Sequence, residues 1–212
     1  MDLSLASLAY AQRKSNELCF PNIDYLQADI LHLHQMGKEF DIIESSGVLH
    51  HMDEPMAGWK VLVDLLKPGG LMKIGLYSDL ARSQIVEARK EIASLGIGTS
   101  ETEIRNFREL LRLSESEGIK RLKTYSDFFS LSEFRDLVFH EQEHRFTLPQ
   151  IKNCLNELGL KFCGFENTEL FSNFTEFYGN EADIYDLELL HQFEESNPEA
   201  FIGMYQFWCQ KL

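Results

Sequence analysis

Cysteine and proline are scarce in this chain, and long apolar runs are missing. The 212 residues include four cysteines and five prolines, and no two cysteines form a C-x-x-C pair. Such scattered thiols do not match the ligand spacing of a zinc site and favour free cysteines in a reducing compartment. No apolar run approaches the roughly 20 residues that span a bilayer, and no leader-like segment opens the sequence. The composition therefore predicts a cytoplasmic protein without a membrane partner.

Basic residues are also in short supply. Lysine and arginine number 20 against 34 aspartates and glutamates, which gives a formal net charge of −14 and a pI of about 4.9. A field of this sign repels phosphate backbones, so we expect no nucleic acid partner. The hydrophobic fraction of 44% and the aromatic fraction of 12% are typical of a globular protein with one sizeable core.

A third absence is the phosphate-cradling loop G-x-G-x-x-G. The only G-x-G triplet, Gly96-Ile97-Gly98, falls between two expected helices rather than after a strand. This context argues against a dinucleotide-binding fingerprint within these residues.

Strands and helices alternate in the first third of the chain. Apolar periodicity predicts helices over 3–18 and 54–66, a short irregular turn over 31–38, and strands over 23–28, 40–45 and 70–77. Pro68-Gly69-Gly70 is expected to separate the second helix from the third strand. Alternation of this kind indicates a mostly parallel sheet covered on both faces, and therefore an α/β fold.

The pattern changes after Tyr77. Residues 78–145 are expected to be almost entirely helical, with a capping box at Ser100 and Glu103. The remaining predicted elements are helices over 147–159 and 181–195 and strands over 160–165 and 203–211. We therefore divide the chain into a core segment 1–77, a helical insertion 78–146 and a second core segment 147–212.

Two stretches carry the functional information. The pattern of Asp41–Glu44 predicts a strand, which is followed by the small-residue loop Ser45–Met52. The pattern of Leu65–Gly75 predicts the end of a helix and then another strand. Open α/β sheets place ligands at such carboxyl ends of strands. Together the two stretches resemble the fourth and fifth strands of class I S-adenosylmethionine-dependent methyltransferases, and the resemblance extends over residues 2–77 and 147–211.

This resemblance implies a Rossmann-like methyltransferase sheet with a helical lid insertion and the strand order 4-5-7-6. It also implies that the first strand, the glycine-rich cofactor loop and most of the second strand lie upstream of Met1. The strand over 23–28 would then lose its neighbours, and its exposed edge favours self-association. Cofactor binding by the 212 residues alone is accordingly in question.

The resemblance also assigns cofactor-binding residues. Asp2, followed by Leu3, occupies the position of the carboxylate that binds the ribose hydroxyls of S-adenosylmethionine, and Asp29 that of the carboxylate facing the adenine amino group. Ile30 would pack on the adenine ring. The residues Ser46 and Gly47 would face the methionine end. For both aspartates, capping of the following helix is an alternative role.

His50 follows the carboxyl end of a strand and is a candidate general base for an O–H or N–H acceptor. Many methyl transfers need only positioning, so a purely structural His50–His51 pair is an equal alternative. The insertion 78–146 would build the acceptor pocket, with the aromatic run Tyr125–Leu131 either lining it or packing in a core. The acceptor, a small molecule or a protein, cannot be identified from these residues.

A competing motif is His140-Glu141-Gln142-Glu143-His144, which matches the zincin pattern H-E-x-x-H. On a helix, its two imidazoles would share a face and could bind zinc, with Glu141 activating water. Lining of the acceptor pocket and a solvated helix face are the alternatives. A zinc-dependent hydrolase and a non-catalytic partner domain therefore stand beside the methyltransferase prediction.

Overall fold

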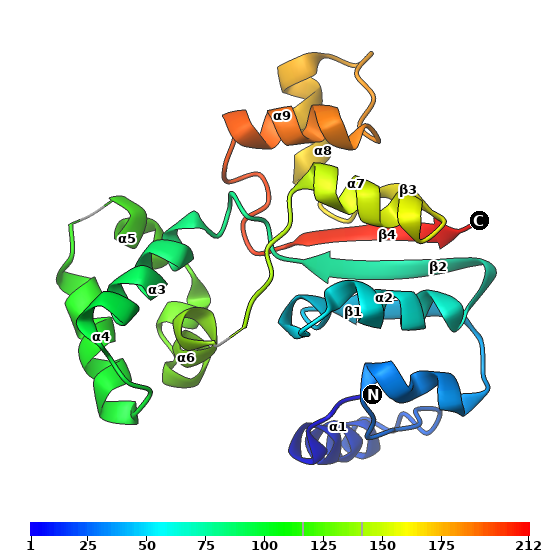
Figure 1. The fold of residues 1–212 in the computed structure, drawn as a ribbon, viewed down its shortest axis with the longest axis horizontal. Helices are drawn as coiled ribbons and strands as arrows, with labels where there is room; N and C mark the ends of the chain where they lie inside the picture. Colours follow the sequence, from blue (N-terminus) through cyan, green and yellow to red (C-terminus); the bar gives the residue numbers. More distant parts are fainter. Residues whose placement is uncertain (116, 141) are drawn as a thin grey trace.

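The computed structural model describes residues 1–115, 117–140 and 142–212, and its centre is a four-stranded sheet (Figure 1). The strands are β1 (Phe40–Ser46), β2 (Leu66–Leu76), β3 (Leu160–Phe165) and β4 (Tyr205–Lys211), in the order β1-β2-β4-β3. β1 and β2 are parallel, whereas β4 runs antiparallel to both of its neighbours. This order confirms the predicted arrangement 4-5-7-6 for an α/β methyltransferase-type sheet.

Helices cover the sheet because each strand presents apolar side chains to them. Met72, Ile74 and Leu76 alternate along β2 and are fully buried. The helices outside the segment 79–145 are α1 (Leu5–Glu17), α2 (Pro55–Asp64), α7 (Leu148–Glu157), α8 (Thr168–Tyr178) and α9 (Leu187–Ser196), with the 3₁₀ turns η1 (Ile30–Met36) and η2 (Leu49–His51). In the described residues, no helix combines the length and the apolar composition needed to cross a bilayer.

The segment 79–145 forms a helical block with its own core. It contains α3 (Ser83–Leu95), α4 (Glu101–Leu113), α5 (Glu117–Leu122), η3 (Ser126–Phe128) and α6 (Leu131–Phe139). Its buried apolar side chains form a cluster separate from the one around the sheet. Figure 1 shows the helical block at one end of the molecule, beyond the carboxyl end of β2. The predicted capping box at Ser100 and Glu103 is confirmed at the start of α4.

Two extended segments join the helical block to the sheet. Ser78 and Phe146 form a parallel bridge, and the amide of Phe146 donates to the carbonyl of Tyr77 at 2.9 Å. Beneath this crossing lies Glu194, a fully buried carboxyl group that accepts hydrogen bonds from Ser78 at 2.5 Å and from Tyr205 at 2.6 Å. Burial raises the pKa of Glu194, although both hydroxyl donors counteract the increase. The crossing is thus held by directed polar bonds.

Two of the predicted elements are wrong, and a third begins earlier than expected. Residues 23–28 do not form a strand; Gln27 makes only an isolated parallel bridge to Asp2, because no described strand pairs with the outer edge of β1. Helix α6 ends at Phe139, so the predicted helix includes neither His140, which is extended, nor residues 142–145. Strand β2 already begins at Leu66, because a register shift in the pairing with β1 accommodates the Pro-Gly-Gly segment within the strand.

Helix α8 was not predicted at all, and α9 begins six residues later than expected. Asn167 accepts hydrogen bonds from two backbone amides at the start of α8, and Asp186 does the same for one amide of α9. These are ordinary N-caps, but they lie in a polar and aromatic segment whose helical periodicity is weak.

Candidate functional site

Two cavities lie near the carboxyl ends of β1 and β2. The first, which we call the β1 cavity, has a volume of about 350 Å³ and collects residues from three separate segments. Its lining residues are Met1, Asp2, Leu3, Ala28, Asp29, Ile30, Glu44, Ser45, Ser46, Val48, Met52 and Leu62. The structure therefore brings together five residues that the sequence assigned to one site, namely Asp2, Leu3, Asp29, Ile30 and Ser46.

The two aspartates of the β1 cavity are held by local hydrogen bonds. One carboxylate oxygen of Asp2 accepts from the amide of Ser4 at 2.7 Å, and one of Asp29 accepts from the amide of Leu31 at 2.9 Å. The second oxygen of each carboxylate accepts no hydrogen bond from any described residue. Asp29 thus caps η1, as the alternative interpretation held, whereas α1 is capped by Ser4 and Asp2 only accepts from the amide of that residue. Each carboxylate still offers a second oxygen to a ligand.

Gly47 directly follows Ser46 but is not among the residues that line the β1 cavity. Its φ of 75° is in the left-handed region, where glycine is unstrained, and its amide donates to the carbonyl of Gly75 at 3.3 Å. The backbone of β1 therefore bends away next to the end of β2, which leaves the small residues Ser46, Gly47 and Gly75 side by side.

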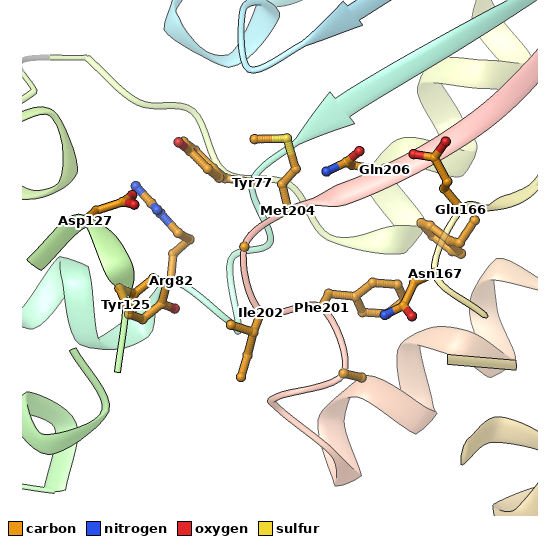
Figure 2. Close-up of a pocket in the computed structure, with 13 residues that line it drawn as sticks. Tyr77, Arg82, Tyr125, Asp127, Glu166, Asn167, Phe201, Ile202, Met204 and Gln206 are labelled. Carbon is orange, nitrogen blue, oxygen red and sulfur yellow. The ribbon is translucent and has the colours of Figure 1, made fainter. Parts of the chain in front are cut away.

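The second cavity, which we call the Tyr77 cavity, lies between the sheet and the helical block and has a volume of about 400 Å³. Figure 2 shows Tyr77, Arg82, Tyr125 and Asp127 on one side and the residues of β3, β4 and their adjoining loops on the other. The latter are Phe165, Glu166, Asn167, Ala200, Phe201, Ile202, Gly203, Met204 and Gln206. Aromatic side chains and a few polar groups thus converge on a space open to solvent.

A buried ion cluster supports the wall of the Tyr77 cavity. Arg82 donates two hydrogen bonds to the carboxylate of Glu143, at 2.5 and 3.2 Å, and Arg89 donates a third at 2.9 Å. Burial alone would raise the pKa of Glu143, but the two arginines together hold it below its ordinary value. The guanidinium of Arg82 also lies 3.7 Å from the ring centroid of Tyr77, a cation–π contact that fixes both side chains.

His50, the candidate base, is fully buried and lines neither cavity. Its ring lies 4.0 Å from that of Tyr77, and its two ring nitrogens form no hydrogen bond with the described residues. Burial lowers the pKa of His50 to about 3; His51 and Arg82 act in the same direction, and Glu143 opposes them. At neutral pH the imidazole is uncharged, and it reaches the Tyr77 cavity only through the Tyr77 ring. Its role as a base stays a prediction.

The zinc motif does not have the geometry that its sequence suggested. His140 is the extended residue after α6, and Glu141 lies outside the described residues. The ring of His140 stacks on that of His51 at 4.0 Å, and the amide of His144 donates to the carbonyl of His50 at 2.8 Å. Among the residues that the structure describes, no three potential ligands are grouped to hold a metal ion. The segment instead ties the helical block to the loop after β1.

Several residues of the Tyr77 cavity escaped the sequence analysis. Arg82 and Glu143 are 61 residues apart, and Met204 comes from a loop that precedes the last strand. Arg82 lay in a segment with helical charge spacing, which favoured a solvated face over a buried ion pair. No local pattern marks such residues, because only the crossing of distant segments brings them together.

Comparisons with known proteins are consistent with this arrangement. Residues 1–74 match the sequence model of the methyltransferase-domain family. An uncharacterized protein of Synechococcus sp., syc1184_c, is 28% identical over 178 residues, which cover 80% of this chain and 42% of that protein.

Two solved structures match almost the whole chain. The structure of PKMT2 from Rickettsia typhi matches with a TM-score of 0.66 at 15% identity, and that of the same protein in complex with AdoHcy with a TM-score of 0.65 at 18% identity. Each match covers 99% of this chain and 42% of the PKMT2 chain. The chain thus spans less than half the length of the proteins it matches.

Proposed function

We propose that the β1 cavity binds S-adenosylmethionine and that the chain serves methyl transfer as a class I methyltransferase, because residues 1–74 match the sequence model of the methyltransferase-domain family and the whole chain shares the fold of PKMT2. The observation that carries the proposal is the convergence of Asp2, Asp29 and Ser46 on one cavity, although they come from three segments. The AdoHcy complex of PKMT2 supports the choice of ligand.

The donor set of the β1 cavity fits the nucleoside part of this cofactor. The free carboxylate oxygens of Asp2 and Asp29 are suited to hydroxyl and amino donors, which the ribose and the adenine provide. Ile30, Val48 and Met52 add apolar surface of the kind that packs on a planar ring. The bound cofactor would supply an activated methyl group, so the protein's task is to hold and orient it.

The small residues at the carboxyl end of β1 suit the methionine part. Ser46 lines the cavity, and Gly47 lets the backbone come close to a ligand. The sequence offers no glycine-rich loop here: Gly96–Gly98 lies between α3 and α4, where the amide of Gly98 donates to the side chain of Glu103. Within this chain, cofactor affinity therefore depends on the carboxylates more than on a backbone cradle.

We assign the acceptor to the Tyr77 cavity. This cavity adjoins the carboxyl end of β2, and its walls come from both the sheet and the helical block. Tyr77, Tyr125 and Phe201 supply aromatic surface on which an acceptor can pack. His50, whose ring lies against Tyr77, is kept as the proposed base, and Asp127 and Glu166 are the carboxylates that line the cavity itself.

Calorimetric titration with S-adenosylhomocysteine tests the cofactor site. We expect the chain to bind the ligand, and Asp29→Asn to weaken the affinity about tenfold, since one charged acceptor is lost. Asparagine is also a good N-cap, so the start of η1 should be preserved.

Asp24→Asn is the matched control. Asp24 is an exposed carboxylate of the same segment that does not line the β1 cavity, so its replacement should leave the affinity unchanged. A wild-type chain that releases no heat with the ligand would contradict the proposal. If Asp29→Asn and Asp24→Asn weakened the affinity equally, Asp29 would not belong to the site, and the loss would reflect only the change in overall charge.

A further inference from the structure

Met204 lines the Tyr77 cavity, and its side chain lies close to Ser46, a residue of the β1 cavity lining. Gly75 has no Cβ, but a Cβ placed on it would lie 2.6 Å from the sulfur of Met204 and 3.0 Å from the Cα of Ser46, so both atoms are close to this glycine. A Cβ on Gly47 would lie 3.8 Å from the terminal methyl group of Met204. The thioether therefore rests on the glycines at the ends of β1 and β2, next to Ser46 of the cavity lining.

The same side chain also lines the Tyr77 cavity. Figure 2 shows it pointing toward Tyr77 and the end of β2, away from Phe201 and Ile202. The next residue, Tyr205, is fully buried at the start of β4, which fixes the backbone from which the side chain extends. Met204 itself is only partly buried, so one of its surfaces faces open space.

We propose that Met204 is a positioning residue that borders both cavities, so that its thioether contacts the ligand of the β1 cavity at its methyl-bearing end. This inference rests on the proposed function. Methyl transfer needs donor and acceptor atoms about 3–3.5 Å apart and in line, so the thioether would border the meeting point of the two ligands without lying between them. Methionine suits this place, because it is unbranched, adaptable and polarizable.

Methionine-methyl NMR on the full chain tests the contact without requiring activity. The chain has six methionines, and we expect S-adenosylhomocysteine to shift the methyl signals of Met52 and Met204. The signal of Met72, which is fully buried in β2, should stay in place. Met204→Leu and Met52→Leu assign the two signals.

Comparison of two probes locates the methyl group. S-adenosylmethionine and S-adenosylhomocysteine differ by the transferable methyl group and its charge. We expect the Met204 signal to differ between the two complexes, while the Met52 signal is the same in both. A Met204 signal that stays in place while that of Met52 moves would overturn the inference and leave the proposed function intact. If neither signal moves and no heat is released, the proposed function itself fails.

Affinity provides a second readout. Met204→Ala should weaken S-adenosylhomocysteine binding about threefold to tenfold, whereas Met204→Leu, which nearly conserves volume, should stay close to wild type. Met36→Ala is the control, because Met36 is an exposed methionine that lines neither of the two cavities. Unchanged affinity in Met204→Ala, with the thermal midpoint also unchanged, would contradict the role.

Discussion

The sheet region and the helical block are each held together by a core of apolar side chains, whereas polar and ring contacts join the two regions to each other. Each has its own cluster of buried apolar side chains, centred on β2 and β4 in one case and on α3, α4 and α6 in the other. Between them, the ring of His51 bonds to the carbonyl of Gln142, and Arg82 lies on Tyr77. Interdigitated cores resist rearrangement, whereas a few directed bonds can break and re-form. The Tyr77 cavity lies at the boundary where the molecule can most easily adapt.

The largest effect should come from breaking the buried ion cluster. Glu143→Ala leaves Arg82, whose side chain is 3% exposed, and Arg89 without their anion. We expect a loss of about 3–5 kcal/mol in the free energy of unfolding, measured by urea denaturation. Glu101→Ala, which removes an exposed i,i+4 pair with Arg105, should cost only about 0.3–0.5 kcal/mol. Similar losses in the two variants would show that the cluster is not a buried one.

Core truncations test whether the two regions unfold separately. Leu111→Ala in the helical block and Leu155→Ala beside the sheet each remove a buried side chain and should cost about 2–5 kcal/mol. Hydrogen exchange read by mass spectrometry should show faster exchange in α3–α6 for the first variant and in the sheet region for the second. Equal loss of protection throughout the chain in both variants would mean that the molecule unfolds as one cooperative unit.

A smaller effect should follow from filling the space at the ends of the strands. Gly75→Ala places a methyl group against Met204 and Ser46, and we expect it to cost about 1–3 kcal/mol. Part of this loss should be recovered in the double variant Gly75→Ala, Met204→Ala, because the sulfur is then absent. A double-mutant cycle based on urea denaturation measures the coupling. Strictly additive losses would show that Met204 does not pack on Gly75.

The last effect appears only when the pH is lowered. Burial lowers the pKa of His50 to about 3 from the ordinary value of 6.5, so the unfolded chain binds its proton first as the pH falls. The stability that neutral His50 contributes is complete above pH 6.5 and is lost toward pH 3, with a slope approaching about 1.4 kcal/mol per pH unit. His50→Gln should flatten the decline between pH 6 and 4, relative to wild type, in thermal unfolding. Parallel curves for the two proteins would show that His50 titrates normally in the folded state.

Local signals predicted much of the fold. The capping pairs Ser100–Glu103 and Thr147–Gln150 start helices as expected, and the apolar runs before Ser46 and after Gly70 form paired strands. The errors fall where local preference meets a tertiary constraint. The predicted helix does not continue through residues 142–145, because the amide of His144 bonds to His50 in the loop after β1 and Phe146 pairs with Tyr77–Asp79.

The candidate site likewise contains some residues that the sequence could predict and others that it could not. Asp29 and Ser46 could be predicted because each follows a strand-like run, and Asp2 because of the family resemblance; the structure places all three on one cavity. The assignments of cofactor roles to these residues, and of the base role to His50, remain predictions. Met204 and Arg82 could not be found from the sequence, since neither belongs to a local pattern and both gain their meaning from residues far away in the chain.

The sequence by itself determined most of the types of elements, because caps and periodicity act over a few residues, and its family resemblance gave the order of the sheet strands and the carboxylates at the β1 cavity. Only the tertiary structure decided how the helical block returns to the sheet, which side chains bury their charges together and what lies beside both cavities. Those outcomes depend on burial and on segments far apart in the chain, such as those of Ser46 and Met204, where no short-range pattern carries the information.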